Sequence, residues 1–386
     1  MDEQAVSLKT HSLSLMLSKM EDPRDEEKVF YPIAEIFFLL ITACLSGCNE
    51  LTEIQEFGQQ KISWLRSYYP FSKGIPSHDT LGRVLAMVNK KSFEQLFTQW
   101  VVEQFNLPEG ELVNFDGKRL ASSANRADQS KSRSEGGRYA EVIVHAFASG
   151  AGIALAQRNV TEKINEVEGA NDLLDTLDLK GCCVSGDSNF CGRDIIAKII
   201  NKKADYLLSL KGKSMCLFTA VKQAMADPKT EKDSFITEEK GHGRYEKREY
   251  YALPAANLPE LEIKGYVGLA QVIQVNRSRT IMRSGEHQEE THFYITSLNK
   301  PIEELAAKIR AHWHVENKLH YVLDVLFEED DNRLRTNNAA TNLSLVRKIT
   351  LNLIRQEEDK GSLKAQRLRC AFSDEYRSNI LKFIMR

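Results

Sequence analysis

The order of strands and helices between residues 111 and 211 constrains the fold most strongly. Apolar runs bounded by turn residues predict three strands, then a helix, a strand, a second helix and a fifth strand. The second and third strands, residues 140–149 and 152–160, meet at the sequence SGAG, which is typical of a hairpin. This order favours an α/β fold built around one sheet.

The residues before this region predict a helical N-terminal domain. The segment 31–45 is apolar almost all round, which is typical of a buried helix. Ser77 is placed to cap a further helix over HDTLGRVLAMV. The pair of helices around this loop could read DNA, with Arg83 exposed on the second, although plain helical packing explains the same pattern.

After the fifth strand the pattern changes twice. Residues 212 to 300 contain the strand-like segments EKREYYALP, GLAQVIQV and THFYITSL, which predict a β-rich insertion. The helical pattern returns at Pro301 and includes a basic helical tail. We therefore expect four regions, with boundaries at 1–107, 108–211, 212–300 and 301–386.

Composition narrows the class of protein without identifying a partner. The chain carries 52 basic and 54 acidic residues, so a nucleic-acid partner would have to bind local basic patches. The longest apolar run, residues 36–48, is too short to cross a bilayer, and the charged first 29 residues are no signal peptide. Seven irregularly spaced cysteines argue against a disulfide framework, so we expect a cytoplasmic protein with no membrane partner.

Two aspartates are expected at the carboxyl ends of strands. Asp116 closes ELVNFD and Asp187 closes GCCVSGD, where open α/β sheets bind ligands. If the first and fourth strands are neighbours, both carboxylates reach one crevice, and oxygen ligands there suit Mg²⁺ or Mn²⁺. Both residues could instead be simple turn formers, since each precedes Gly or Ser.

A third acid lies in the predicted helix HWHVENKLHYVLDVLFEED, residues 312–330. His312, Glu316, His320 and Asp324 recur every four residues beside a separate apolar stripe. A helix packed across the sheet would bring Glu316 to the two aspartates and complete a cage of carboxylates. This role explains a carboxylate placed between two imidazoles.

The sequence resembles the insertion-sequence transposases that include the H-repeat-associated proteins of Rhs elements, within the DDE superfamily. The resemblance covers nearly the whole chain and runs through FDGKRL and SGDSNF; its distinctive blocks are IPSHDT and HWHVENKLHYVLDVLFEED. It implies an RNase H-like catalytic core that a β-rich insertion interrupts before the last helix. It also implies that Asp116, Asp187 and Glu316 bind metal.

The resemblance implies a DNA transposase that cuts and joins element ends by metal-assisted phosphodiester hydrolysis and strand transfer. Two Mg²⁺ (or Mn²⁺) ions would clamp the scissile phosphate. We expect Asp116 to bridge both ions, and Asp187 and Glu316 to hold one each. The expected partners are double-stranded DNA and a second copy of the chain, as a homodimer.

Cations near these acids are candidates for DNA phosphate contacts. His312 and His320 could orient Glu316, touch a phosphate, or form a neutral pair in the core. We expect Asn317 and Asp324 to orient the metal ligands from outside. The candidate DNA-binding residues are Lys118, Arg119, Lys211, Lys213, His242, Arg244, His312 and His320.

Two alternatives stay open. Relatives elsewhere in the superfamily carry an Arg four residues before the Glu and a Lys seven after it, but here these positions are His312 and Leu323. A catalytically weakened or inactive DNA-binding remnant of a mobile element is therefore one alternative. A zinc hydrolase using His312, His314, Glu316 and His320 is the other, although the HExxH spacing is absent and His314 faces away from His312.

Overall fold

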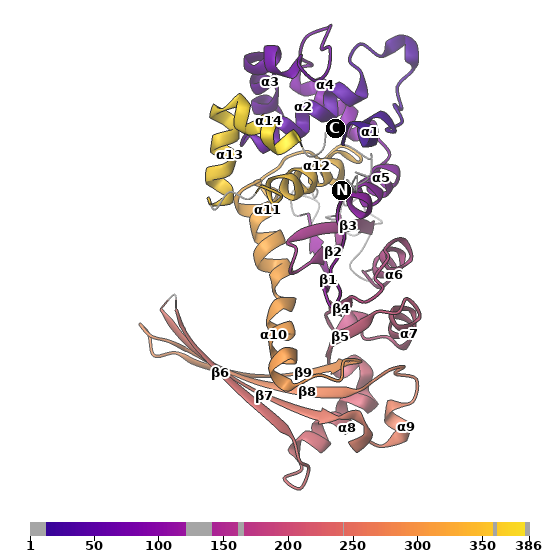
Figure 1. The fold of residues 1–386 in the computed structure, drawn as a ribbon, viewed down its shortest axis with the longest axis vertical. Helices are drawn as coiled ribbons and strands as arrows, with labels where there is room; N and C mark the ends of the chain where they lie inside the picture. Colours follow the sequence, from indigo (N-terminus) through magenta and orange to yellow (C-terminus); the bar gives the residue numbers. More distant parts are fainter. Residues whose placement is uncertain (1–12, 121–140, 161–165, 242, 358–360, 383–386) are drawn as a thin grey trace, which may run out of the picture.

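One nine-stranded mixed sheet runs through the molecule, in the order β3-β2-β1-β4-β5-β9-β8-β7-β6 (Figure 1). This computed structural model describes residues 13–120, 141–160, 166–241, 243–357 and 361–382. Among these residues, none of the helices combines the length and apolarity that crossing a bilayer requires.

The first five strands follow the order that the sequence predicts. β1 (Leu112–Arg119) pairs antiparallel with β2 (Val142–Ala148), which pairs antiparallel with β3 (Ile153–Val160). β4 (Cys183–Gly186) lies parallel to β1 on its other side, and β5 (Asp205–Leu210) lies parallel to β4. Helices α6 (Glu166–Thr176) and α7 (Arg193–Asn201) stand where the sequence predicts them.

The β-rich segment after β5 does not form a separate sheet. Its last strand pairs antiparallel with β5, so the insertion extends the same sheet from the fifth strand outward. The strands of the insertion are β6 (Asp233–Gly241), β7 (Arg244–Pro254), β8 (Gln271–Ile281) and β9 (His287–Thr296). Helices α8 (Met215–Ala226) and α9 (Glu260–Ile263) also lie in it, whereas the strand pattern had predicted only turns between strands.

Helix α10 (Ile302–His312) connects the insertion to the first sheet strands. Its buried residues Ile302, Leu305 and Ile309 share one apolar cluster with Leu112 of β1 and Tyr294 of β9. The helix leads from the β6–β9 end of the molecule toward α11 (Tyr321–Val325) (Figure 1). It therefore fixes the position of the insertion relative to β1.

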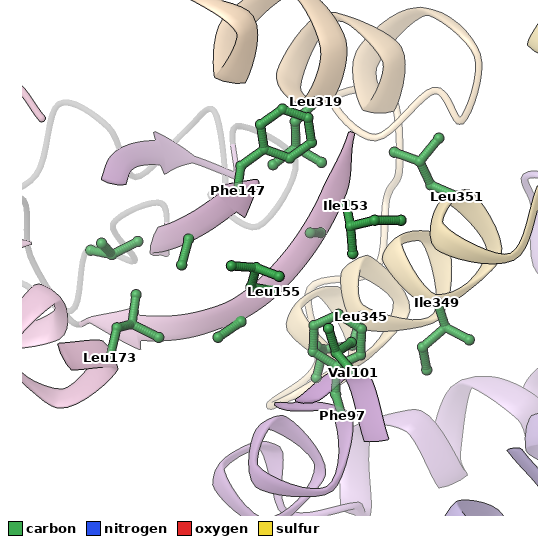
Figure 2. Packing of buried hydrophobic residues seen from close by; sticks show 14 of the residues in the cluster. Phe97, Val101, Phe147, Ile153, Leu155, Leu173, Leu319, Leu345, Ile349 and Leu351 are labelled. Atoms are coloured by element: carbon green, nitrogen blue, oxygen red, sulfur yellow. The ribbon is translucent and has the colours of Figure 1, made fainter. Parts of the chain in front are cut away.

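The N-terminal helices pack around α12 (Ala339–Ile354) at the other end of the molecule (Figure 1). All of α12 is buried, including its polar residues. Figure 2 shows Leu345 of this helix beside Phe97 and Val101. The other helices here are α1 (Leu13–Ser18), α2 (Ile33–Leu45), α3 (Leu51–Leu65), α4 (His78–Met87), α5 (Lys90–Gln104), α13 (Leu363–Phe372) and α14 (Asp374–Lys382).

The loop before α4 follows the sequence prediction closely. The Ser77 hydroxyl accepts a hydrogen bond from the backbone N–H of Thr80 at 3.3 Å, as an N-cap does. Arg83 is exposed on α4, as expected, and its guanidinium donates to the Asp79 carbonyl and to Thr80.

Candidate active site

Asp116 and Asp187 lie at the same level of neighbouring parallel strands. The parallel pairing of β1 with β4 ends at Phe115 and Gly186, and the residue that follows each of them is an aspartate. β1 itself does not end at Asp116, as the sequence had suggested. It continues to Arg119 because β2 goes on pairing with it on the other side. Asp116 thus lies where the parallel half of the ladder stops.

One face of β1 meets the segment from α10 to α11. The Asn114 amide donates to the carbonyls of Ala311 and His312, each at 3.0 Å. Farther along the same face, Asp116 Oδ2 lies 3.6 Å from His320 Nδ1. Alternate residues of a strand share a face, so Asp116 points toward this segment.

Glu316 lies in a π-helical turn, η8 (Val315–His320), rather than in a continuous α-helix. The change of helix type interrupts the four-residue stripe that the sequence predicted, since π-helical hydrogen bonds run from i to i+5. Val315, Leu319 and Leu323, which belong to the apolar stripe of the predicted helix, are buried, while the side chain of Glu316 is exposed. Such turns occur often at functional sites.

Neighbouring acids act on the ionisation of Asp116. The pKa of its carboxyl is raised to about 7, chiefly because burial disfavours the ionised form. The carboxylates of Glu316, Asp187 and Glu166 raise this pKa further. The three acids that the sequence singled out therefore interact electrostatically, and a fourth acid joins them.

Glu166 is the residue that sequence reasoning missed. It is buried at the start of α6, and its carboxylate accepts a hydrogen bond from the Asn189 amide at 3.2 Å. The same amide donates to Asp187 Oδ2, also at 3.2 Å. A Cβ on Gly117 would lie 2.5 Å from Glu166 Oε1, so the glycine makes room for this acid. Two residues in the sequence carry a signal for this acid: Gly117 directly follows Asp116, and Asn189 stands two positions after Asp187.

The three histidines near Glu316 bind different partners. His312 Nδ1 lies 3.1 Å from the Ser185 hydroxyl, and His314 Nδ1 lies 2.9 Å from the Ser149 hydroxyl. His320 Nε2 lies 3.1 Å from His145 Nδ1. This arrangement does not favour the zinc-hydrolase alternative, in which the imidazoles would share one ion.

His312 and His320 are neutral at pH 7. Burial lowers the pKa of His312 to about 4 and that of His320 to about 3, and the charge of Lys118 adds to the shift at His320. Neither imidazolium is therefore available to balance Asp116.

Lys118 and Asp324, both candidate site residues, form an ion pair with each other. Lys118 Nζ also lies 2.9 Å from Glu329 Oε2, and only 9% of its side chain is exposed. The structure thus places Lys118 inside a network of carboxylates.

The other candidate DNA-binding residues lie apart. Arg119, Lys211 and Arg244 are exposed, and Lys211 follows β5 at the sheet edge that also carries Asp187. Arg244 and Asn317 line a groove between α10 and the β6–β9 sheet. His242 and the side chain of Lys213 lie outside the described residues.

The acids do not form a preformed metal cage. Across the described residues, no three His, Cys, Asp or Glu side chains converge closely enough to hold an ion. The donor chemistry nevertheless fits a hard divalent cation, because the charges of Glu316, Asp187 and Glu166 disfavour the ionised form of Asp116 and all four groups offer carboxylate oxygens.

Comparison with known proteins identifies the family. Residues 108–353 match the transposase DDE domain, and residues 15–101 match the DDE_Tnp_1-associated region. The chain is 34% identical over 377 residues to the putative transposase YncI of Escherichia coli O157:H7, covering 96% of this chain and 94% of that protein. It is 31% identical to the H repeat-associated putative transposase YhhI of Escherichia coli K12, covering 95% and 96%.

A solved structure of the piggyBac transposase synaptic complex with hairpin DNA shows a TM-score of 0.44 and 10% identity, covering 97% of this chain and 79% of that one. That similarity is too low to argue from. The sequence matches are sufficient, since one family match spans more than half of the chain and the two relatives cover nearly all of it. The chain belongs to the DDE transposase family, with relatives of the H-repeat-associated type.

Proposed function

We propose that this protein is a DNA transposase that cuts and joins element ends with Asp116, Asp187 and Glu316. The single observation that carries this proposal is the electrostatic meeting of the three acids. Asp187 and Glu316 both raise the pKa of Asp116, although 129 positions separate them in the chain. Membership of the DDE family supplies the reaction class.

The sheet supports an RNase H-like core for this activity. The order β3-β2-β1-β4-β5, with β1, β4 and β5 parallel and β2 antiparallel, agrees with the topology that the resemblance implies. The central parallel strands β1 and β4 stop pairing at the same level, so the two aspartates that follow lie side by side at the carboxyl end of this pairing. The β6–β9 segment is then an insertion that prolongs the core sheet.

These acids would hold two divalent ions, Mg²⁺ or Mn²⁺. Bound at this place, such ions polarise the scissile phosphate and lower the pKa of an attacking water. Asp116 would contact the metal from β1, Asp187 from the end of β4 and Glu316 from η8. Asn189 holds Asp187 through two hydrogen bonds, from its backbone N–H at 2.7 Å and from its amide.

Glu166 is a further candidate ligand in this proposal. It lies against Gly117, the residue that follows Asp116, and shares the Asn189 amide with Asp187. As a ligand or as a fixed charge, it adds negative potential where a cation would bind.

Nicking of DNA that carries the element ends tests the proposed function. The wild-type protein is expected to cut in Mg²⁺ or Mn²⁺ and not in a chelator, and Asp187→Asn and Glu316→Gln are expected to lose cutting while staying folded by circular dichroism. Asp194→Asn is the matched control, because this aspartate is exposed in the first turn of α7. Cutting that persists in Asp187→Asn would contradict the assignment.

A DNA-binding remnant without catalytic activity is the second candidate. The observation that favours it is the lack of a converged metal cage among the described residues. The same assay separates the two, because a remnant would bind end-bearing DNA and cut it under none of these conditions.

A further inference from the structure

Strand β1 contacts the helical segment that carries Glu316 at two points, one before this residue and one after it. Asn114, Asp116 and Lys118 alternate along β1, so their side chains lie on one face of the strand. At the first point, the Asn114 amide donates to the last two carbonyls of α10, each at 3.0 Å. Lys118 makes the second point of contact, and Asp116 lies between the two.

Lys118 binds the segment that follows Glu316. Its ammonium forms an ion pair with Asp324 of α11, eight residues beyond Glu316, and lies 2.9 Å from Glu329 Oε2 in the loop after α11. Asp330 Oδ1 lies 4.0 Å away. Only 9% of the Lys118 side chain is exposed, so carboxylates of the chain take the place of water around this ammonium.

Helix α12 fixes Glu329 as well. The Ser344 hydroxyl donates to Glu329 Oε1 at 2.7 Å, and only 1% of Glu329 is exposed. All of α12 is buried, so this helix is a firm support for the loop after α11. Lys118 therefore joins β1 to α11 directly and to α12 through Glu329.

We propose that Lys118 is a positioning residue, which holds η8 in register with β1 and thereby brings Glu316 to the divalent ions that Asp116 binds. This proposal rests on the proposed function, which supplies the metal role of both acids. The exposed side chain of Glu316 stands on a π-helical turn, a rare geometry that depends on its surroundings. Ligands must be held to within about 0.5 Å, so anchors on both sides of this turn decide whether the acids converge.

The contacts of Lys118 do not suit a role in binding DNA phosphates, which the sequence had suggested. A phosphate would have to displace Asp324 or Glu329 from the ammonium. Displacing Glu329 would leave a buried carboxylate without one of its cations, which is costly. We therefore expect DNA binding in the absence of metal to be independent of Lys118.

Binding of Mn²⁺ to the intact chain without DNA, measured by electron paramagnetic resonance, tests the positioning role. Lys118→Met is expected to weaken Mn²⁺ binding by about tenfold or more. Removing a positive charge would by itself strengthen the binding of a cation, so a weaker Mn²⁺ affinity reports displaced ligands. Lys118→Arg keeps a cation for the same carboxylates and should stay within about threefold of the wild type.

Lys90→Met is the matched control, because Lys90 Nζ also forms an ion pair, 3.1 Å from Glu141 Oε1, but stands on α5. It should leave the Mn²⁺ affinity unchanged. A variant that combines Lys118→Met with Glu329→Gln removes one charge of each sign, so no buried carboxylate loses its cation. Its Mn²⁺ binding should stay weak while circular dichroism shows that it is folded.

Affinity for duplex DNA in chelator, measured by fluorescence anisotropy across a salt series, separates positioning from a phosphate contact. Lys118→Met should bind DNA as the wild type does, with the same slope of log affinity against log salt. A phosphate contact would instead lower the magnitude of this slope by about 0.9.

Unchanged or stronger Mn²⁺ binding in Lys118→Met and in the double variant would overturn the proposal, and so would a lowered salt slope. If Asp187→Asn loses both Mn²⁺ binding and cutting while the Lys118 variants keep both, only the positioning role is refuted. A wild-type protein that shows no Mn²⁺ binding dependent on Asp187 and cuts no DNA refutes the proposed function, and the positioning role with it.

Discussion

Glu329 is fully buried and Asp116 is partly buried, and the pKa values of their carboxyls move in opposite directions. Burial by itself would raise the pKa of Glu329, but the charges of Lys348 and Lys118 outweigh it and lower this pKa to about 2. The pKa of Asp116 is raised to about 7 by burial and by neighbouring carboxylates. Lys118 lies two residues from Asp116 on β1, yet it pairs with Glu329.

The two pKa values differ because the chain places cationic side chains beside Glu329 and acidic ones beside Asp116. The Ser344 hydroxyl donates to Glu329 Oε1 at 2.7 Å, and Lys348 Nζ donates to Ser344 at 2.5 Å, so the Glu329 site is complete. Asp116 accepts a hydrogen bond from the backbone N–H of Gly117 at 2.9 Å, and the His320 imidazole lies 3.6 Å from its Oδ2. A complete network stabilises the fold, whereas an incomplete one favours binding of an external cation.

Removing a cation from the complete site should have the largest effect. Lys348→Met leaves Glu329 without one of its buried partners, so we expect it to lower the free energy of unfolding by about 3–5 kcal/mol in urea titrations. Adding Glu329→Gln to this variant should recover part of the loss. A loss under about 1 kcal/mol in the single variant would show that the network is not a stabilising one.

Removing the charge from the incomplete site should have the opposite sign. Asp116→Asn is expected to raise the free energy of unfolding by on the order of 2 kcal/mol at pH 8 without metal. The pKa of this group is raised above its ordinary value of 3.8, so its cost grows as the pH rises from about 4 to about 7. Urea titrations at pH 4 and pH 8 check this, and an equal effect at both values would contradict it.

The Glu329 site predicts the reverse pH dependence. Its lowered pKa stabilises the fold above the ordinary value of 4.5, and this contribution is lost as the pH falls toward 2. Wild-type stability should therefore fall more steeply below pH 4.5 than that of Glu329→Gln. If the stability of the wild type and of Glu329→Gln fell in parallel with pH, ionisation of Glu329 would not be the cause of the wild-type loss.

A divalent cation that binds beside Asp116 should stabilise the folded protein. At tenfold excess over its dissociation constant, Mg²⁺ is expected to stabilise the wild-type protein by about 1.4 kcal/mol, measured by thermal denaturation at pH 8. Asp187→Asn should lose this effect and Asp194→Asn should keep it. Equal stabilisation of all three proteins would indicate binding elsewhere.

The smallest loss of stability is expected at Ser185, which contacts Asn114 and the segment just before η8. Ser185 is buried, and its hydroxyl donates to Asn114 Oδ1 at 2.7 Å while contacting His312. Ser185→Ala should cost about 1 kcal/mol in urea titrations, because Asn114 loses a partner. No change would mean that Asn114 finds another donor.

Periodicity and turn residues were sufficient for the local elements. Helices α2, α4, α6 and α7 and strands β2 to β5 stand where their patterns predicted them. Patterns failed where neighbours decided the outcome. The helix predicted over 312–330 changes to a π-helical turn at Val315, and the strand before Asp116 runs on because β2 continues to pair with it.

The sequence by itself determined the chemistry of the candidate site: which carboxylates are present, on which elements they stand, and which family the chain resembles. It did so because strand ends, helix stripes and family motifs are local or are carried by residue order. Only the tertiary structure decided that Glu166 joins these acids, that Lys118 pairs with Glu329, and that the insertion extends the core sheet. Those outcomes depend on contacts between distant segments, where burial and neighbouring charge set the energy of each ionised group.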